Sequence, residues 1–216
     1  MDWAYPERIF GPSLDASVLR ALWRSGTHLT GAQVHRLTGI GSERGVRYAL
    51  ARLVTHGIVT TWSVGASHVY GLNTSHLAYP AVDAAFRALD PWQALTRRTE
   101  ALVADTLAPG EVGGRLAAPD VTVSVFGSVA RGTADEDSDL DLLVVVPDDV
   151  PGGTHLAERL EVEGRRWTGQ RVQVYLTTRS ALAHARDAGD PVVTAFRTDA
   201  RRIHGPSIDA LLRPAA

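Results

Sequence analysis

The stretch from Val121 to Val146 reads VTVSVFGSVARGTADEDSDLDLLVVV and decides how the rest of the chain is interpreted. It opens with a β-prone run, Val121 to Phe126, and closes with a second apolar run, Leu140 to Val146. A Gly-Ser pair and a polar, acid-rich turn lie between the two runs. This order predicts a strand, a tight turn and a second strand.

Two aspartates, Asp139 and Asp141, stand one residue apart where the second run starts. Side chains alternate faces along a strand with period two. Both carboxylates should therefore point the same way, while Leu140 and Leu142 point into a core. Paired carboxylates on one face, next to a Gly-Ser turn, are suited to hold a divalent metal and phosphate together.

The composition is that of a globular protein with one large or two small domains: 216 residues, 44% hydrophobic and 21% charged. The absence of cysteine excludes disulfides, thiolate metal sites and cysteine nucleophiles. All 22 basic residues are arginine, so phosphate contacts must come from guanidinium groups, backbone N–H groups or hydroxyls. No secretory signal and no apolar run of about 20 residues is visible, so we expect no membrane partner and a cytoplasmic location.

Charge is unevenly spread along the chain. The segment from Leu14 to His76 contains six arginines and two acids, which gives it a charge of +4 within a chain of net charge -2. A basic N-terminal part on an acidic whole predicts a nucleic-acid or acidic partner for that part.

The basic segment shows three helical patterns followed by a hairpin pattern, after an irregular lead-in over residues 1–13. The predicted helices cover Leu14–Trp23, a stretch from an N-cap at Thr30 through Leu37, and a stretch from a cap at Ser42 to Gly57. The predicted hairpin pairs Ile58–Val64 with His68–Leu72 around a three-residue turn that contains Gly65.

Residues 14–75 resemble the winged helix-turn-helix family of DNA-binding domains. The resemblance rests on the Ser42 cap, the apolar face Val46/Leu50/Leu53, the HGIV helix exit and the hairpin. It implies a double-stranded DNA partner, with the third helix in the major groove. The residues it assigns to DNA binding are Ser42, Arg44, Arg47, Tyr48, Arg52 and His68.

Within that set, Arg44, Arg47 and Tyr48 would read base edges, Arg52 would contact phosphate, and His68 would touch the backbone or minor groove. Two other interpretations stay open: that the arginines only solvate a surface helix, or that the domain binds proteins. A homodimer is expected because winged helices commonly read two half-sites.

The fold class predicted for the whole chain is α/β (α+β), because strands alternate with helices after the basic segment. Three ranges are expected: a winged helix domain over 1–77, a helical linker over 78–112 and a mixed-sheet domain over 113–216. The later predicted elements include a strand over Arg171–Thr177 and helices over His155–Trp167, Arg179–Ala188 and Pro191–Arg197.

The central stretch is similar to the nucleotidyltransferase signature of the DNA polymerase β superfamily, and the similarity extends over roughly residues 97–208. The matching positions are Gly127, Ser128, Ala130, Arg131, Gly132, Ser138, Asp139 and Asp141. The resemblance implies that Asp139 and Asp141 are catalytic and bind Mg²⁺ or Mn²⁺. It also implies that Gly127, Ser128 and Arg131 bind the phosphates of a nucleoside triphosphate such as ATP.

Arg131 has a second interpretation, in which it fixes the loop by pairing with a nearby acid such as Asp137. An arginine between acids more often has such a structural role.

The chain departs from the family pattern at one position. Active members carry a third carboxylate on a later strand, and the matching position here is Gln173. A neutral amide cannot act as a general base, although it can offer a carbonyl oxygen to a metal. Other acids are near in sequence but not on that strand: Asp148, Asp149, Glu161 and Glu163.

Three functions follow from these residues. The first is a DNA-binding protein that transfers a nucleotidyl group from Mg-NTP to an unknown acceptor. The second is a transcriptional regulator whose nucleotidyltransferase domain has lost catalysis and senses a nucleotide. The third is an antitoxin-like enzyme with a protein acceptor.

Overall fold

The computed structural model describes residues 1–107, 120–135, 137–148 and 152–213. The chain forms two compact units: Tyr5–Asp90 make up the first, and Met1–Ala4 together with Pro91–Ala216 make up the second. The predicted linker range 78–112 contains one helix of the first unit and one of the second, and its last five residues lie outside the described part. None of the helices in the described part has the length and apolar character needed to span a membrane.

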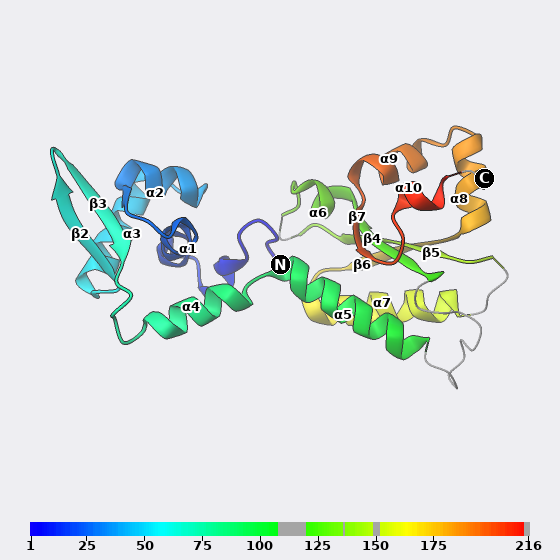
Figure 1. Cartoon of the computed structure of the whole chain (residues 1–216), viewed down its shortest axis with the longest axis horizontal. Helices are drawn as coiled ribbons and strands as arrows, with labels where there is room; N and C mark the ends of the chain where they lie inside the picture. The colour runs from blue at the N-terminus through cyan, green and yellow to red at the C-terminus, as the bar shows by residue number, and fades with distance from the viewer. Residues whose placement is uncertain (108–119, 136, 149–151, 214–216) are drawn as a thin grey trace. The chain divides into compact units, whose positions relative to one another are not determined.

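The first unit contains helices and a small three-stranded sheet (Figure 1). Its elements in chain order are η1 (Pro6–Phe10), α1 (Asp15–Ser25), β1 (Leu29–Thr30), α2 (Gly31–Thr38), α3 (Glu43–Thr55), β2 (Val59–Val64), β3 (Ser67–Leu72) and α4 (Tyr79–Ala88). The core between the helices and the sheet is made by Val18, Leu22, Val34, Val46, Leu50, Leu53 and Ile58 among others. The apolar face predicted for the third helix, Val46/Leu50/Leu53, is therefore buried.

Side-chain caps fix where α2 and α3 begin. Thr30 and Gln33 form a capping box, in which the Gln33 backbone N–H donates to Thr30 Oγ1 at 3.3 Å and the Thr30 N–H donates to Gln33 Oε1 at 2.8 Å. Ser42 Oγ accepts from the backbone N–H of Gly45 at 3.1 Å. Both predicted caps are confirmed.

Two short elements and one turn differ from the sequence prediction. The lead-in contains the 3-10 helix η1, which has proline at its start. The strand β1 was not predicted, because two residues carry no periodicity. The hairpin turn has two residues instead of three: Val64 pairs with Ser67 in the register of β2 and β3, and Gly65 adopts a φ of +59°.

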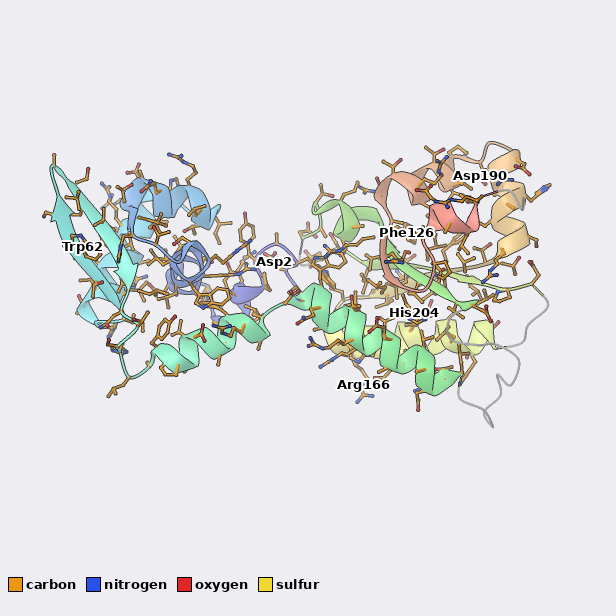
Figure 2. The ribbon with its side chains drawn as sticks, viewed as in Figure 1. Asp2, Trp62, Phe126, Arg166, Asp190 and His204 are labelled. Atoms are coloured by element: carbon orange, nitrogen blue, oxygen red, sulfur yellow. The ribbon has the colours of Figure 1, made fainter. Side chains whose placement is uncertain are left out.

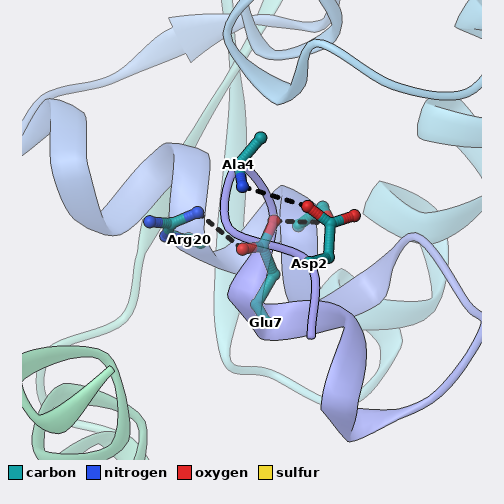
Figure 3. A network of polar contacts seen from close by, with 5 residues as sticks. Asp2, Ala4, Glu7 and Arg20 are labelled. Carbon is teal, nitrogen blue, oxygen red and sulfur yellow. Dashed lines mark hydrogen bonds and ion pairs between the residues drawn. The ribbon is translucent and has the colours of Figure 1, made fainter. Parts of the chain in front are cut away.

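A buried ion pair fastens η1 to α1 (Figure 3). Glu7 is 2% exposed, and its Oε2 accepts from Arg20 Nη1 at 2.6 Å. Its other oxygen, Oε1, accepts from Ser17 Oγ at 2.9 Å. Since both carboxylate oxygens are bonded, the charge is compensated inside the unit.

The second unit contains a four-stranded mixed sheet in the order β6-β5-β4-β7. Its elements are α5 (Pro91–Thr106), β4 (Thr122–Phe126), α6 (Gly127–Arg131), β5 (Leu140–Val146), α7 (Gly153–Thr168), β6 (Val172–Thr178), α8 (Arg179–Asp187), α9 (Pro191–Asp199), β7 (Arg201–His204) and α10 (Ile208–Leu211). Strands β5 and β6 are parallel and are joined through α7, whereas the β4–β5 and β4–β7 pairs are antiparallel. The predicted class, mixed α and β, is confirmed.

Helices cover both faces of this sheet (Figure 1). On one face, α5 and α7 bury alternate residues of β5, including Leu140, Leu142 and Val144. On the other face, α8, α9 and α10 pack against Leu143 and Val145. Strand β5 is buried on both faces. Its residues that point to one face belong to one hydrophobic core, and those that point to the other face belong to a second core.

The N-terminal tetrapeptide belongs to the second unit through Trp3. The Trp3 indole Nε1 donates to Gln170 Oε1 at 2.7 Å, and both side chains are buried. The Trp3 ring also packs against Trp92 of α5, with 5.0 Å between ring centroids. The 3-10 helix that follows belongs to the first unit.

Candidate functional site

The candidate site lies where β4 ends and β5 begins. Phe126, the last residue of β4, pairs with Asp141, the second residue of β5. The five-residue helix α6 follows β4 directly, and Gly132 ends it in the left-handed region at a φ of +72°. This register brings the Gly-Ser turn and the two aspartates to the same edge of the sheet.

Gly127 lies close to the Asp141 carboxylate. Its φ is +72°, and a Cβ built at this position would lie 2.5 Å from Asp141 Oδ2. The backbone angle favours glycine, and any side chain here would also push the Asp141 carboxylate out of its present position. The turn backbone therefore lies directly against Asp141.

Asp139 and Asp141 are both partly buried. Leu140 and Leu142 point into the core under α5 and α7, as predicted, so Asp141 faces the opposite side of β5. Burial raises the pKa of the Asp141 carboxyl above its usual value. The negative charge of Asp139 raises this pKa further, and the positive charge of Arg131 opposes the rise.

Arg131 pairs with an acid, but the predicted partner is wrong. Its Nη1 donates to Asp199 Oδ2, at the end of α9, at 2.6 Å. The acidic loop that contains Asp137 is held by bonds to Asp135. The backbone N–H of Asp137 donates to Asp135 Oδ1 at 3.2 Å, and Ser138 Oγ donates to the same oxygen at 2.7 Å. The latter bond holds the pKa of Asp135 below its usual range.

Gln173 lies beside the two aspartates. The parallel register of β5 and β6 pairs Asp141 with Gln173. The Gln173 side chain donates from Nε2 to Asp139 Oδ2 at 2.5 Å. The amide of Gln173, the residue predicted to match the third carboxylate of the family, thus contacts Asp139.

The remaining acids near this strand are bonded elsewhere. Asp148 accepts from Ser180 Oγ and from its backbone N–H, Glu161 accepts from the backbone N–H of Val174 at 3.2 Å, and Glu163 pairs with Arg166 at 2.8 Å. Asp149 lies outside the described residues. Within the described ranges, no group of three or more acids, histidines or cysteines is arranged to hold a metal ion. The carboxylate donors at the site are therefore Asp139 and Asp141.

The residues predicted to bind DNA are exposed in the first unit. Tyr48 Oη accepts from Arg44 Nη2 at 2.9 Å, and this guanidinium also lies over the Tyr48 ring, 5.4 Å from its centroid. Arg52 pairs with Asp15 of α1 at 2.9 Å. Arg47 makes no hydrogen bond or ion pair to any residue within the described ranges.

Ser42 serves as the cap of α3, as described above. His68 lies on β3 next to the hairpin turn, opposite Ser63. Trp62, on the other strand of the hairpin, packs its ring edge against His28 with 4.3 Å between centroids (Figure 2). These contacts place all six predicted residues on α3, at its start, or on the hairpin.

A pocket next to α6 was not predicted. Its volume is about 170 Å³, and it is lined by Trp3, Trp92, Arg131 and Arg201 among others. The Arg201 guanidinium lies over the Trp92 ring, 3.8 Å from the centroid. Sequence patterns do not reveal this pocket, because its walls come from four segments that are distant in the chain.

A family model matches part of the second unit. Residues 114–187 match the family model described as the nucleotidyltransferase domain. The matched range includes Gly127, Asp139, Asp141 and Gln173. It stops in α8, so α9, β7 and α10 lie beyond it. The chain thus contains a region that matches a nucleotidyltransferase domain, next to a separate helical unit.

Two solved structures are similar to the chain. One is a toxin–antitoxin with AMP-PNP, at 19% identity and a TM-score of 0.32, covering 52% of this chain and 80% of that one. The other is TrmBL2, an archaeal chromatin protein with a novel mode of DNA binding, at 16% identity and a TM-score of 0.28, covering 89% of this chain and 75% of that one. TM-scores this low do not support any conclusion about function. Among curated proteins, none matches the sequence.

Proposed function

We propose that the protein binds a nucleoside triphosphate with a divalent cation at Gly127, Ser128, Asp139 and Asp141, and transfers its nucleotidyl group to an acceptor. One observation carries this proposal. The backbone at Gly127 lies so close to the Asp141 carboxylate that a Cβ built there would stand 2.5 Å from Oδ2. A phosphate-binding turn and a metal-binding carboxylate in direct contact are what this reaction requires.

The donor set fits Mg²⁺ or Mn²⁺. Both ions prefer oxygen ligands, and Mg²⁺ is usually held by one or two carboxylates, water and the phosphates of the substrate. Asp139 and Asp141 repel each other, and this repulsion contributes to the raised pKa of Asp141. A bound cation offsets the negative charge of the phosphates when the acceptor oxygen attacks and pyrophosphate leaves. ATP is the nucleotide we would test first.

The protein's own groups have separate roles in this proposal. Asp139 and Asp141 hold the cation, while Gly127 and Ser128 border the phosphates. Arg131 holds α6 to α9 through Asp199, so its guanidinium orients the turn. Attack forms a bond from the acceptor oxygen to the α-phosphorus and breaks the bond to pyrophosphate. The acceptor's proton passes to water or to the departing pyrophosphate, because the neutral amide of Gln173 cannot take it.

A degenerate, nucleotide-sensing domain in a transcriptional regulator is the second candidate. The observation in its favour is the hydrogen bond from Gln173 Nε2 to Asp139 Oδ2. This amide occupies an oxygen that a metal would otherwise take. In this case a nucleotide would change DNA affinity without transfer of any group.

We further propose that the first unit is a winged helix that binds double-stranded DNA as a homodimer. Three helices precede the hairpin, and α3 presents Arg44, Arg47 and Tyr48 to solvent. Arg47 is without a partner in the described part of the chain, so it can contact DNA without breaking an internal bond. Arg52 has to leave Asp15 to do the same.

The transfer reaction is tested with labelled ATP, CTP, GTP and UTP, each with Mg²⁺ and cell extract. We expect label on a protein, RNA or small-molecule acceptor, and a protein acceptor would favour the antitoxin-like function. The double variant Asp139→Asn/Asp141→Asn should abolish labelling. Asp137→Asn is the matched control, since this exposed loop acid should leave labelling unchanged. Labelling that persists in the double variant would refute the proposal.

A further inference from the structure

A row of three aromatic rings crosses the sheet next to the carboxylates. Phe126 ends β4, Phe196 comes from α9, and Tyr175 lies on β6. The Phe126 and Phe196 centroids are 5.1 Å apart in an edge-to-face arrangement. The Phe196 and Tyr175 centroids are 5.4 Å apart. Figure 2 labels Phe126 at the end of its strand, on the face that α9 covers.

The strand register sets the distance between this row and the carboxylates. Asp141 pairs with Gln173, and the next same-face pair is Leu143 with Tyr175. Same-face neighbours on a strand are about 7 Å apart, because each residue rises about 3.3 Å. Tyr175 is therefore the first side chain beyond Gln173 on the face that carries Asp141.

The three rings differ in exposure. Phe196 is 1% exposed, and Tyr175 is 45% exposed. The Tyr175 hydroxyl donates no hydrogen bond to any residue that the structure describes. The Tyr175 ring therefore contacts Phe196 and is also partly exposed to solvent. Phe196 lies outside the matched range 114–187, so α9 adds this support to the matched region.

We propose that Tyr175 is the surface on which the nucleobase of the bound triphosphate stacks. The inference rests on the proposed function, because it requires phosphates at Gly127 and a cation at Asp139 and Asp141. An aromatic ring stacks on any base, since every base has a π-face. Tyr175 thus strengthens binding of all four nucleotides and discriminates weakly among them. A purely structural Tyr175 would only cover Phe196.

The test is calorimetric titration of the full chain, in Mg²⁺, with ATP and with inorganic triphosphate, which has no base. In Tyr175→Leu the apolar cover of Phe196 is kept and the ring is lost. We expect ATP binding about 5- to 100-fold weaker, with triphosphate binding unchanged within about twofold. Tyr175→Phe keeps the ring and should match the wild type for both. Val162→Ala, at an exposed apolar residue of α7 in the same unit, is the control and should bind both ligands as the wild type does.

A second arm needs no variant, so it does not depend on folding of Tyr175→Leu. Wild-type protein should bind ribose 5-triphosphate about 5- to 100-fold more weakly than ATP. Equal weakening of ATP and triphosphate in Tyr175→Leu, or no weakening of either, would overturn the inference. Equal wild-type affinity for ATP and ribose 5-triphosphate would overturn it and leave the proposed function intact. A wild type that binds none of these ligands would refute both.

Discussion

The two units hold their candidate residues in different ways. In the second unit, Gly127 and Asp141 are fixed by backbone contact and strand register. In the first unit, the candidates are exposed side chains of α3, and Arg47 makes no polar contact within the described residues. The proposed nucleotide site is therefore fixed before any ligand binds, whereas the proposed DNA-binding surface is made of separate exposed side chains. Single substitutions should be severe in one unit and mild in the other.

The largest expected effect is that of Gly127→Ala. The new Cβ would overlap Asp141 Oδ2, and the φ of +72° would be strained, so backbone and carboxylate both have to move. We expect ATP affinity to fall by about 100-fold, equivalent to about 2.7 kcal/mol. Calorimetry in Mg²⁺ measures this change.

Gly132→Ala is the matched control for this variant. Gly132 has the same φ of +72°, but a Cβ there meets nothing within 4 Å. It should cost only the left-handed strain, about 1–2 kcal/mol of folding free energy, and leave ATP affinity close to the wild type. Equal loss of ATP binding in both variants would show that contact with Asp141 is not what matters.

Gln173→Asp adds the carboxylate that the family pattern expects and removes the amide bond to Asp139. More ligand charge should tighten Mg²⁺ binding by about tenfold, and the new base should raise the transfer rate. Gln173→Ala is the control, because it frees Asp139 without adding charge. If both variants gain equally, release of Asp139 alone explains the effect.

Arg47→Ala should weaken DNA binding by about 5- to 10-fold. The slope of log affinity against log salt concentration should become less steep by about one. Arg52→Ala should have a smaller effect, because Arg52 already pairs with Asp15. Fluorescence anisotropy with double-stranded DNA at several salt concentrations measures both. Unchanged affinity and slope in Arg47→Ala would remove α3 as the DNA-binding element.

The smallest expected effect concerns stability and pH. The pKa of Asp141 is raised in the folded protein, so the native state holds this proton more tightly than the unfolded chain. Its contribution to stability is therefore present at low pH and is lost as pH rises from the unfolded pKa through the folded one.

Asp141→Asn should remove this pH-dependent loss of stability. The Tm of the metal-free variant should therefore exceed that of the metal-free wild type near neutral pH. Each kcal/mol of stability that is regained raises the Tm by about 2–4 °C. Thermal unfolding from acid to neutral pH measures the difference between variant and wild type. If the Tm difference between variant and wild type does not grow as the pH rises, the raised pKa of Asp141 is contradicted.

The sequence predicts those features that depend on local patterns. Thr30 and Ser42 predict where their helices begin, because capping involves residues three positions apart. The period of two in β5 assigns Leu140 and Asp141 to opposite faces. The family pattern, placed on the predicted strand Arg171–Thr177, led to Gln173, which the structure pairs with Asp141.

The rest depends on long-range packing. Arg131 meets Asp199, 68 residues along the chain, and no local pattern distinguishes this acid from Asp137. The contact between the Tyr175 and Phe196 rings depends on how α9 folds back over the sheet. The indole of Trp3 reaches Gln170 for the same reason. Partners of this kind become visible only when the register and helix docking are known.

The central claim is that Asp139 and Asp141 form a metal-dependent nucleotide site. Calorimetric titration of ATP with Mg²⁺ into the wild type and into Asp139→Asn/Asp141→Asn tests it most directly. We expect one ATP site per chain in the wild type. ATP should not bind after Mg²⁺ is removed by a chelator, and it should not bind to the double variant. Equal ATP affinity in the wild type and the double variant, or no binding by the wild type, would contradict it.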